Sequence, residues 1–441
     1  MDQSFREVDQ DGNWYWTYGG DYGPKDVPSF GNFCCNGLVN AVREPHPHLL
    51  EVKKIYQNIK STLVDKKNLT IRVKNWFDFS DLNEYLLHWS VTGDDGTIVA
   101  EGSKEVTCAP HAVVDITLGA VKLPKTLREA YLNLSWTRVK ATPLVTSDWE
   151  VAYDQFVLPV SKNSWSGKPG KAGNTTFVVD KSTGALKSLC LDGEELLASP
   201  ITLSLFRPAT DNDNRDQNGA KLWRQAGLDH LTQKVVSLKE GKNKTTVKAD
   251  ILNAEGKKIG NAEFIYALNR DGSMKVQTTF EPDTSLVKSM ARLGVTFEMK
   301  DTYENVTYLG RGEHETYTDR NQSGKIGIYK TTPERMFHYY VVPQSTGNRT
   351  DVRWLQLTDE HGKGCWIEAN SLFQFSTVPF SDVILEKARH INELKRDGKI
   401  TIHLDAEQAG VGTATCGPGV LPSYLVPLTK QTFDVTIYPV K

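Results

Sequence analysis

Apolar and polar side chains alternate with a period of two through most of the chain after about residue 61, and few helical patterns interrupt them. Such alternation is typical of β-strands that bury one face. Strands that follow one another closely, without helices between them, pair with antiparallel neighbours. The sequence therefore predicts a mainly β chain, and its 441 residues are enough for two or three domains with cores of their own.

Residues 61–160 are predicted to form an antiparallel sandwich of roughly 100 residues. The Asp-Asp-Gly turn at residues 94–96 lies between Tyr85–Val91 and Thr97–Ala100, which predicts a β-hairpin. Val151–Val157 is predicted to be the last strand of this sandwich. We expect this domain to be a scaffold with no chemistry of its own.

Residues 161–173 are small, polar and rich in glycine, which is typical of an exposed linker. From residue 174 to residue 441 the strands resume, and a region of this length predicts a large antiparallel sandwich of two sheets. Helical turns are expected only within Gly219–Leu228 and Ser381–Leu394. The predicted strands are Phe177–Val179, Ile201–Phe206, Thr245–Leu252, Met274–Phe280, Ser289–Glu298, Lys399–Leu404 and Thr432–Tyr438.

Residues 1–60 are predicted to contain a turn, a short strand and a helix, which are too few elements for a separate core. Pro47 is suited to the first turn of the helix. Apolar residues at spacings of three and four give this helix one apolar face, which we expect to dock on the next domain. These residues are Leu49, Val52, Ile55, Tyr56 and Ile59.

Composition excludes several classes of function. The formal net charge of -2, with both signs interspersed, provides no basic surface for nucleic acid. No apolar run approaches the roughly 20 residues that span a bilayer, and the first residues do not have the pattern of an export signal. The six cysteines include no C-x-x-C pair, which argues against a disulfide framework and against a zinc site.

Seven motifs carry a specific resemblance. Three lie near the start: W-Y-W-T-Y-G-G-D-Y-G at Trp14–Gly23, F-C-C-N-G-L-V at Phe33–Val39 and R-E-P-H-P at Arg43–Pro47. Four lie in the last region: R-P-A-T-D-N-D at Arg207–Asp213, W-R-Q-A-G at Trp223–Gly227, L-G-R-G-E-H-E-T-Y-T-D-R at Leu309–Arg320 and Q-A-G-V-G-T-A-T-C-G-P at Gln408–Pro418. In order and spacing they resemble the β-galactosidases of glycoside hydrolase family 2, over essentially all 441 residues.

The resemblance implies an architecture. Residues 1–60 would be a short strand-helix remnant of the catalytic (β/α)8 barrel, and residues 61–160 would form an immunoglobulin-like β-sandwich. Residues 174–441 would form the small-chain domain, a large galactose-mutarotase-like antiparallel β-sandwich. Both catalytic glutamates of the family lie in the barrel before the position of Asp2. We therefore expect a C-terminal fragment that is inactive by itself.

The resemblance also implies a function. The parent enzyme would be a retaining exo-β-galactosidase that removes terminal non-reducing β-D-galactose, a homo-oligomer that needs sodium and magnesium. The sequence does not give the compartment, and we expect a soluble protein of either the bacterial cytoplasm or the periplasm. The alternative is a carbohydrate-binding or structural assembly module with its own sugar ligand. Trp165, Trp223 and Trp366 could stack on sugars in such a module, although tryptophan is more often part of a core.

Three site residues follow from the resemblance. Phe33 would line the galactose pocket, and its carbonyl oxygen and the side-chain oxygen of Asn36 would bind sodium. With the remaining ligands upstream, this sodium site would be at most partial, and the magnesium site would lie outside the chain. Cys416 occupies a position where some family members carry a tryptophan that stacks on the substrate, a contact that sulfur cannot provide.

Two acidic clusters have alternative interpretations. Glu313 and Glu315 could act as an acid and a base, or their loop could pack through ion pairs and hydrogen bonds, which we consider the commoner case. The Asp-Asn-Asp run at residues 211–213, near Arg207, could hold a hard cation or form a turn capped by its own side chains.

His46 and His48 flank Pro47 at the predicted helix start. A solvated role for both histidines is expected there, more than metal ligation, because no third ligand lies nearby in the sequence.

Overall fold

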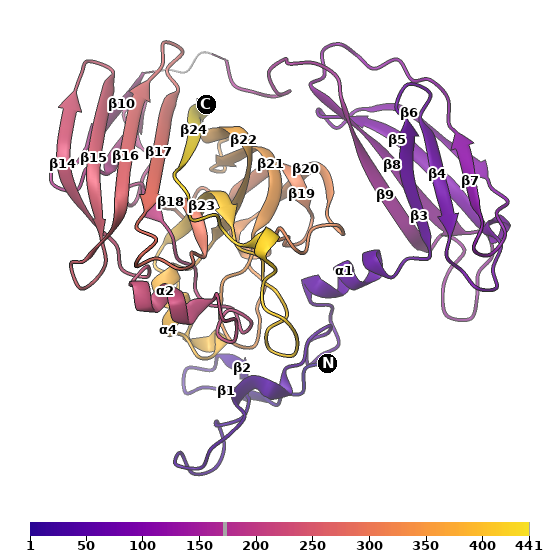
Figure 1. The fold of residues 1–441 in the computed structure, drawn as a ribbon, viewed down its shortest axis with the longest axis horizontal. Helices are drawn as coiled ribbons and strands as arrows, with labels where there is room; N and C mark the ends of the chain where they lie inside the picture. The colour runs from indigo at the N-terminus through magenta and orange to yellow at the C-terminus, as the bar shows by residue number, and fades with distance from the viewer. Residues whose placement is uncertain (171–173, 441) are drawn as a thin grey trace. The chain divides into compact units, whose positions relative to one another are not determined.

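The computed structural model describes residues 1–170 and 174–440, and the chain divides into two compact units (Figure 1). Strands dominate both units, which confirms the predicted mainly β chain. The large unit consists of Met1–His48, Pro169–Gly324 and Tyr329–Lys441, and the small unit consists of Leu49–Lys168 and Lys325–Ile328. Of the predicted linker, residues 161–170 contain no helix or strand, and residues 171–173 lie outside the described residues.

The small unit is a two-sheet antiparallel sandwich. One sheet has the strand order β3-β4-β7 and the other has the order β6-β5-β8-β9. Ile71 and Val73 from the first sheet share a core with Leu87 and Trp136 from the second. Seven strands in sheets of three and four make an immunoglobulin-like sandwich, as predicted. The strands are β3 Ile59–Asp65, β4 Thr70–Asn75, β5 Tyr85–Gly93, β6 Ile98–Glu105, β7 Val113–Thr117, β8 Glu129–Arg138 and β9 Glu150–Pro159, and the 3-10 turn η2 is Leu82–Glu84.

The large unit is built on one extensive antiparallel sheet. Its main path runs β13-β18-β23-β22-β24-β17-β16-β15-β14, and β21 and β19 continue it from β22. β20 pairs with β19, and its first four residues, Lys325–Ile328, are those assigned to the small unit. The strands are β13 Thr202–Ser204, β14 Thr232–Glu240, β15 Lys244–Leu252, β16 Lys258–Leu268, β17 Met274–Pro282, β18 Arg292–Lys300, β19 Asn305–Gly312, β20 Lys325–Thr331, β21 Arg349–Thr358, β22 Gly364–Val378, β23 Lys399–Gln408 and β24 Gln431–Val440.

Strand β22 pairs with two different neighbours along its length. Residues Gly364–Ala369 pair with β24, and residues Gln374–Val378 pair with β23. A single 15-residue strand therefore connects two parts of the sheet, which curls around a common core.

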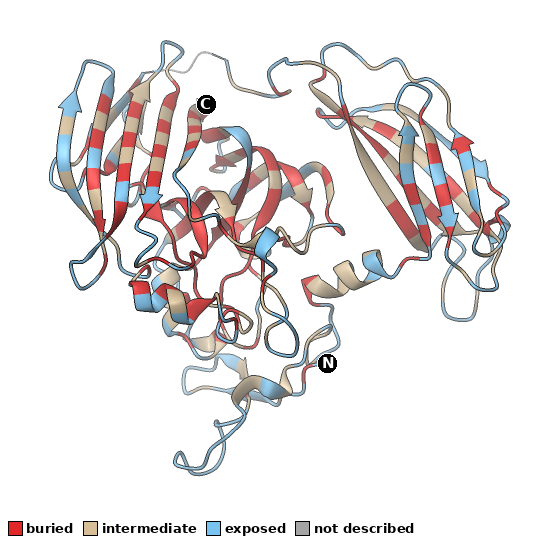
Figure 2. Ribbon diagram, in the orientation of Figure 1, coloured by how far each residue is buried: buried red, intermediate tan, exposed pale blue. Residues whose placement is uncertain are grey.

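The core explains why the strand prediction succeeded. Buried and exposed residues alternate along the strands of the large unit, for example along β15 (Figure 2). A second sheet of β10 Thr175–Val179, β11 Leu186–Leu191 and β12 Glu194–Glu195 contributes Leu186 and Leu189 to the same apolar cluster as Val247 and Phe264. The two sheets enclose one core, as in the predicted large sandwich.

Helices are short and few among the described residues. Both regions predicted to hold helical turns do so: α2 is Ala220–Ala226, and α4 Asp382–Lys387 is followed by the 3-10 turn η3 Ile391–Glu393. The expectation that only these two regions hold helical turns was wrong, because α3 Pro333–Met336 and η4 Pro422–Tyr424 lie outside them. Each is a single turn that starts at or next to a proline, which is too short to give a helical pattern in the sequence. No helix among residues 1–170 and 174–440 is long and apolar enough to cross a membrane.

The opening segment corrects part of the helix prediction. α1 begins at Pro47 as expected, but it ends at Ile55. Ile59 instead begins β3, where it is fully buried in the core of the small unit, and Tyr56 is 77% exposed. The spacing of Ile59 fits both a helix and a buried strand position, and burial in the sandwich decides between them. The other elements are β1 Arg6–Val8, β2 Trp14–Trp16 and η1 Gly31–Cys34.

Candidate functional site

The large unit contains a cavity of about 690 Å³. Four stretches of chain line it: the opening segment, the loop before α2, the region between β19 and β21, and the loop after β23. Lining residues that matter below are Asp2, Asn32, Asn36, His46, His48, Asp211, Asn212, Glu315, Asp319, Arg320, Tyr340 and Cys416.

The structure brings together two of the three residues assigned by resemblance. Asn36 lines the cavity from the opening segment, and Cys416 lines it from the loop after β23. Phe33 is 61% exposed and is not among the lining residues. Cys416 is the one exposed cysteine of the described chain.

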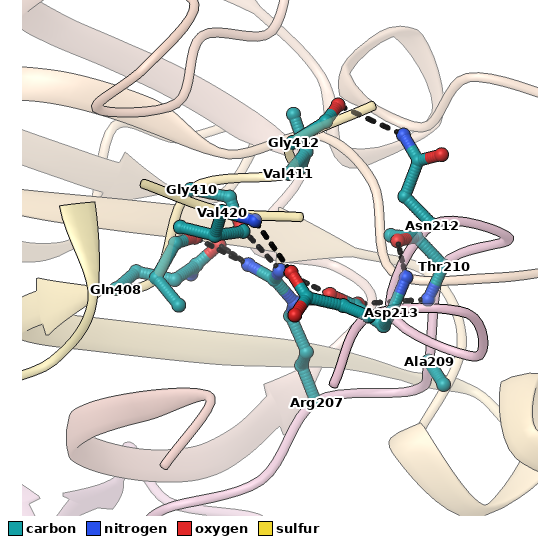
Figure 3. A network of polar contacts seen from close by, with 12 residues as sticks. Arg207, Ala209, Thr210, Asn212, Asp213, Gln408, Gly410, Val411, Gly412 and Val420 are labelled. Atoms are coloured by element: carbon teal, nitrogen blue, oxygen red, sulfur yellow. Dashed lines mark hydrogen bonds and ion pairs between the residues drawn. The ribbon is translucent and has the colours of Figure 1, made fainter. Parts of the chain in front are cut away.

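A buried ion pair supports one wall of the cavity (Figure 3). The guanidinium of Arg207 donates two hydrogen bonds to Asp213, at 3.0 and 2.8 Å, and also donates to the carbonyl oxygens of Ala409 and Gly410 at 2.7 and 2.8 Å. Asp213 also accepts from the backbone N–H of Thr210 at 2.9 Å. Of the two interpretations of this run, the structure shows the turn capped by its own side chains.

The loop that carries Cys416 is held by polar side chains. Asn212 donates to the carbonyl oxygen of Gly412 at 2.9 Å, and its amide oxygen accepts from the hydroxyl of Thr415 at 2.8 Å. Asp319 accepts from the N–H of Gly412 at 2.8 Å. The loop before α2 therefore fixes the loop after β23.

The opening segment is joined to the same wall. The side chain of Asn32 donates to Asp211 at 2.7 Å. Burial raises the pKa of Asp211 above its usual value, although the hydrogen bond from Asn32 acts in the opposite direction. Adjacent residues Asp211 and Asn212 thus contact two different walls of the cavity.

His46 corrects the prediction of a solvated histidine, because it is only 2% exposed. Its Nε2 lies 2.7 Å from Asp2 Oδ2, and its Nδ1 lies 2.7 Å from Nε2 of His338. The second histidine, His48, is half-buried, and its Nε2 accepts from the N–H of Leu38 at 2.9 Å. Packing within the large unit, which local sequence does not reveal, buries the His46 ring and partly covers the His48 ring.

Glu315 and Glu313 do not form an opposed acid-base pair. Glu313 is exposed, whereas Glu315 is 4% exposed and accepts from Arg320, Tyr340, Thr346 and the N–H of Gly347 at 2.5 to 2.8 Å. Burial by itself would raise the pKa of Glu315, but the charge of Arg320 and these hydrogen bonds lower it. The interpretation as a packing loop is therefore the one that fits.

The remaining candidates are structural. Trp165, Trp223 and Trp366 are 8%, 1% and 2% exposed, so they belong to the interior and offer no face to a sugar. Within residues 1–170 and 174–440, no group of three or more His, Cys, Asp or Glu side chains could hold a metal ion.

Sequence reasoning missed His338 and Asp2 as partners of His46. The contacts join positions 292 and 44 residues apart, and no local pattern marks them. The motif R-E-P-H-P, which contains His46, was the one available signal.

Three sequence families match the chain. "Beta galactosidase small chain" matches residues 171–437, "Beta-galactosidase, domain 4" matches residues 71–159, and "Glycosyl hydrolases family 2, TIM barrel domain" matches residues 1–61. The first of these alone covers more than half of the chain.

Individual relatives agree with the family matches. A β-galactosidase of Priestia megaterium is 31% identical over 433 residues, which are 93% of this chain and 41% of the relative. A β-galactosidase of Aeromonas hydrophila is 31% identical over 443 residues, 93% of this chain and 42% of the relative. The chain thus spans about two fifths of the length of these relatives. Among solved structures, an aldose epimerase homologue from C. elegans has a TM-score of 0.34 and 11% identity, covering 60% of this chain and 98% of that chain.

Proposed function

Because the chain belongs to the β-galactosidases of glycoside hydrolase family 2, we propose that it serves the hydrolysis of terminal non-reducing β-D-galactose residues by a retaining, exo-acting enzyme. In this proposal the 441 residues supply one side of the substrate site. The reacting carboxylates come from a part of the enzyme outside these residues, and the whole enzyme is a homo-oligomer.

The observation that carries the proposal is the composition of the cavity walls. Asn36 comes from the segment matched to the barrel family, and Cys416 comes from the segment matched to the small-chain family. One cavity in the large unit receives residues from both segments. A sugar site shared between a barrel and a sandwich would need this arrangement.

The carboxylates that line the cavity support inactivity of the chain by itself. Asp2, Asp211, Glu315 and Asp319 each accept hydrogen bonds from other protein groups. A retaining glycosidase needs one carboxylate free to attack and a second one positioned as a proton donor. Carboxylates that are bound within the protein are poorly suited to either role.

The donor set near Phe33 and Asn36 fits sodium in type. A carbonyl oxygen and an amide oxygen are hard donors, which suit a hard cation. We propose that Phe33 and Asn36 supply two of its ligands, so that the bound ion helps to hold a sugar hydroxyl. The proposal places the remaining sodium ligands and the whole magnesium site outside these 441 residues.

The proposal is tested by assaying the purified chain. It should not hydrolyse a chromogenic β-galactoside, because the attacking and proton-donating groups are absent. The chain should be produced in a host that lacks β-galactosidase, with a mock purification as the control. Turnover that co-purifies with the chain and exceeds the mock preparation would contradict the proposal.

A calorimetric titration separates the proposal from its alternative. Weak binding of galactose that Asn36→Ala abolishes would support a partial galactose site. Tight binding of longer galactans that Asn36→Ala leaves unchanged would instead favour a separate carbohydrate-binding module. Lys181→Ala, at a residue remote from the cavity lining, is the matched control.

A further inference from the structure

A chain of hydrogen bonds runs from the large sandwich to the turn beside Asn36. Nε2 of His338 lies 2.7 Å from Nδ1 of His46, and Nε2 of His46 lies 2.7 Å from Asp2 Oδ2. The other oxygen of Asp2 accepts from the backbone N–H of Gly37 at 2.8 Å. Asp2, the last acceptor in this series of hydrogen bonds, therefore holds Gly37, the residue next to Asn36.

The hydrogen bond between His46 and His338 can form only with certain numbers of protons on the two rings. His46 donates from Nε2 to the Asp2 carboxylate, so its Nδ1 accepts from His338 when both rings are neutral. If the pair gains one proton, His46 Nδ1 can donate to a neutral His338 instead. If it gains two, N–H groups face each other across the same short distance, and the hydrogen bond is lost.

A second contact holds the same turn and depends on another histidine. His48 Nε2 accepts from the N–H of Leu38 at 2.9 Å, which it can do only while that nitrogen carries no proton. The His46 ring stacks on His48 with ring centroids 5.4 Å apart. Of two neighbouring amides in one turn, that of Leu38 thus depends directly on an unprotonated imidazole nitrogen, and that of Gly37 is bound by the Asp2 carboxylate that His46 holds.

The charged surroundings oppose full protonation of this cluster. Burial lowers the pKa of His338 to about 4, with Glu315 acting against this shift and His46 and Arg320 adding to it. Burial also lowers the pKa of His48 to about 4, and Arg320 and His46 add to the shift. The other facing groups are Asp2, Tyr340, Cys35 and the terminal amine of Met1. The contacts therefore persist at neutral pH and are lost in acid.

We propose that His338 is a positioning residue which, through His46 and Asp2, orients the Asn36–Leu38 turn toward the cavity and releases this turn on acidification. The effect of this turn on substrate binding rests on the proposed function, which assigns Asn36 to the galactose site. The hydrogen-bonded arrangement itself does not depend on that assignment.

The test is hydrogen exchange of the full chain, followed by mass spectrometry of peptides that cover the turn, without sugar. His338→Phe removes the donor and should lower protection of the Gly37 and Leu38 amides about five- to tenfold at about pH 7. His338→Gln keeps a side-chain N–H that does not titrate, so it should retain protection at about pH 7 and lose less than the wild type at about pH 4.

The matched control is His361→Phe, because the side chain of His361 is 72% exposed and lies in the same unit. It should leave protection of the turn unchanged. Exchange of the turn in His338→Phe within twofold of the wild type would overturn the proposal. If His338→Phe does not fold, the proposal is tested with His338→Gln alone. Protection of the turn against hydrogen exchange must then change less with pH in His338→Gln than in the wild type. Failure of galactose binding in a separate titration would contradict the proposed function and leave this result standing.

Discussion

The carboxylate of Asp213 faces the guanidinium of Arg207, with two hydrogen bonds between them, and the two side chains are 2% and 0% exposed. A charge buried this deeply is tolerated only with its partner, since solvent cannot replace the lost contact. The pair holds the loop before α2 against the carbonyl oxygens of residues 409 and 410, which lead into the loop of Cys416. Stability and site geometry thus depend on one contact.

Arg207→Ala should destabilise the large unit by about 3–5 kcal/mol, because it leaves the carboxylate of Asp213 buried and unpaired. Urea unfolding followed by intrinsic fluorescence measures the change. The matched control is Lys181→Ala, whose side chain is 74% exposed and is paired with Glu240; it should cost less than about 1 kcal/mol. An equal loss of unfolding free energy in Arg207→Ala and Lys181→Ala would show that burial of the Arg207–Asp213 pair does not matter for stability.

Gly37→Ala should destabilise the protein by at least about 2 kcal/mol. Gly37 has a φ of +77°, and an added Cβ would lie 2.7 Å from Nε2 of His48. Gly12→Ala is the matched control, since its φ is +85° and nothing lies within 4 Å of its added Cβ. It should show only the backbone strain of about 1 kcal/mol. Thermal unfolding of the two variants separates the steric contact from the strain.

Stability should fall as the pH decreases from about 6.5 toward 4. His48 and His338 both have a pKa lowered to about 4 by burial, whereas in the unfolded chain they accept protons near pH 6.5. The unfolded state therefore binds more protons throughout this window, and the stability present above it is lost on acidification. Melting temperatures across this range should decline more steeply for the wild type than for His338→Gln. Parallel declines would contradict a role for His338.

Cys416 should react with a thiol-alkylating reagent well before the other cysteines. It is exposed, whereas Cys108 and Cys365 are buried, and burial raises the pKa of Cys365 to about 12. Peptide mapping after short labelling should find Cys416 modified and the two buried thiols unmodified. Asn212→Ala should speed the labelling, because it removes the hydrogen bonds that hold this loop to the loop before α2. Unchanged kinetics in that variant would show that the loop is held by other contacts.

The strands were predictable because their determinants are local. Alternation along β15, the Asp-Asp-Gly turn between β5 and β6, and the short helices α2 and α4 all appear in the sequence at the positions where they form. Ile59 was misassigned to a helix because its spacing fits both periods, and only the core of the small unit determines its environment.

The site was less predictable because its contacts are distant in sequence. Asn36 and Cys416 were identified through the resemblance, and their roles in binding sugar stay predictions. The burial of His46 depends on His338, which comes from the loop between α3 and β21. A single sequence contains no signal for such a pairing, so a solvated histidine was the wrong expectation.

Strand β24 lies between β17 and β22 in the large sheet, although it follows both of them in the sequence. During synthesis the edges of β17 and β22 that pair with β24 therefore stay unpaired until residues 431–440 have been made. Pairing between strands so far apart in the sequence slows folding and leaves strand edges open to aggregation in the meantime. A polypeptide that stops before β24 would lack the one described strand that pairs with both β17 and β22.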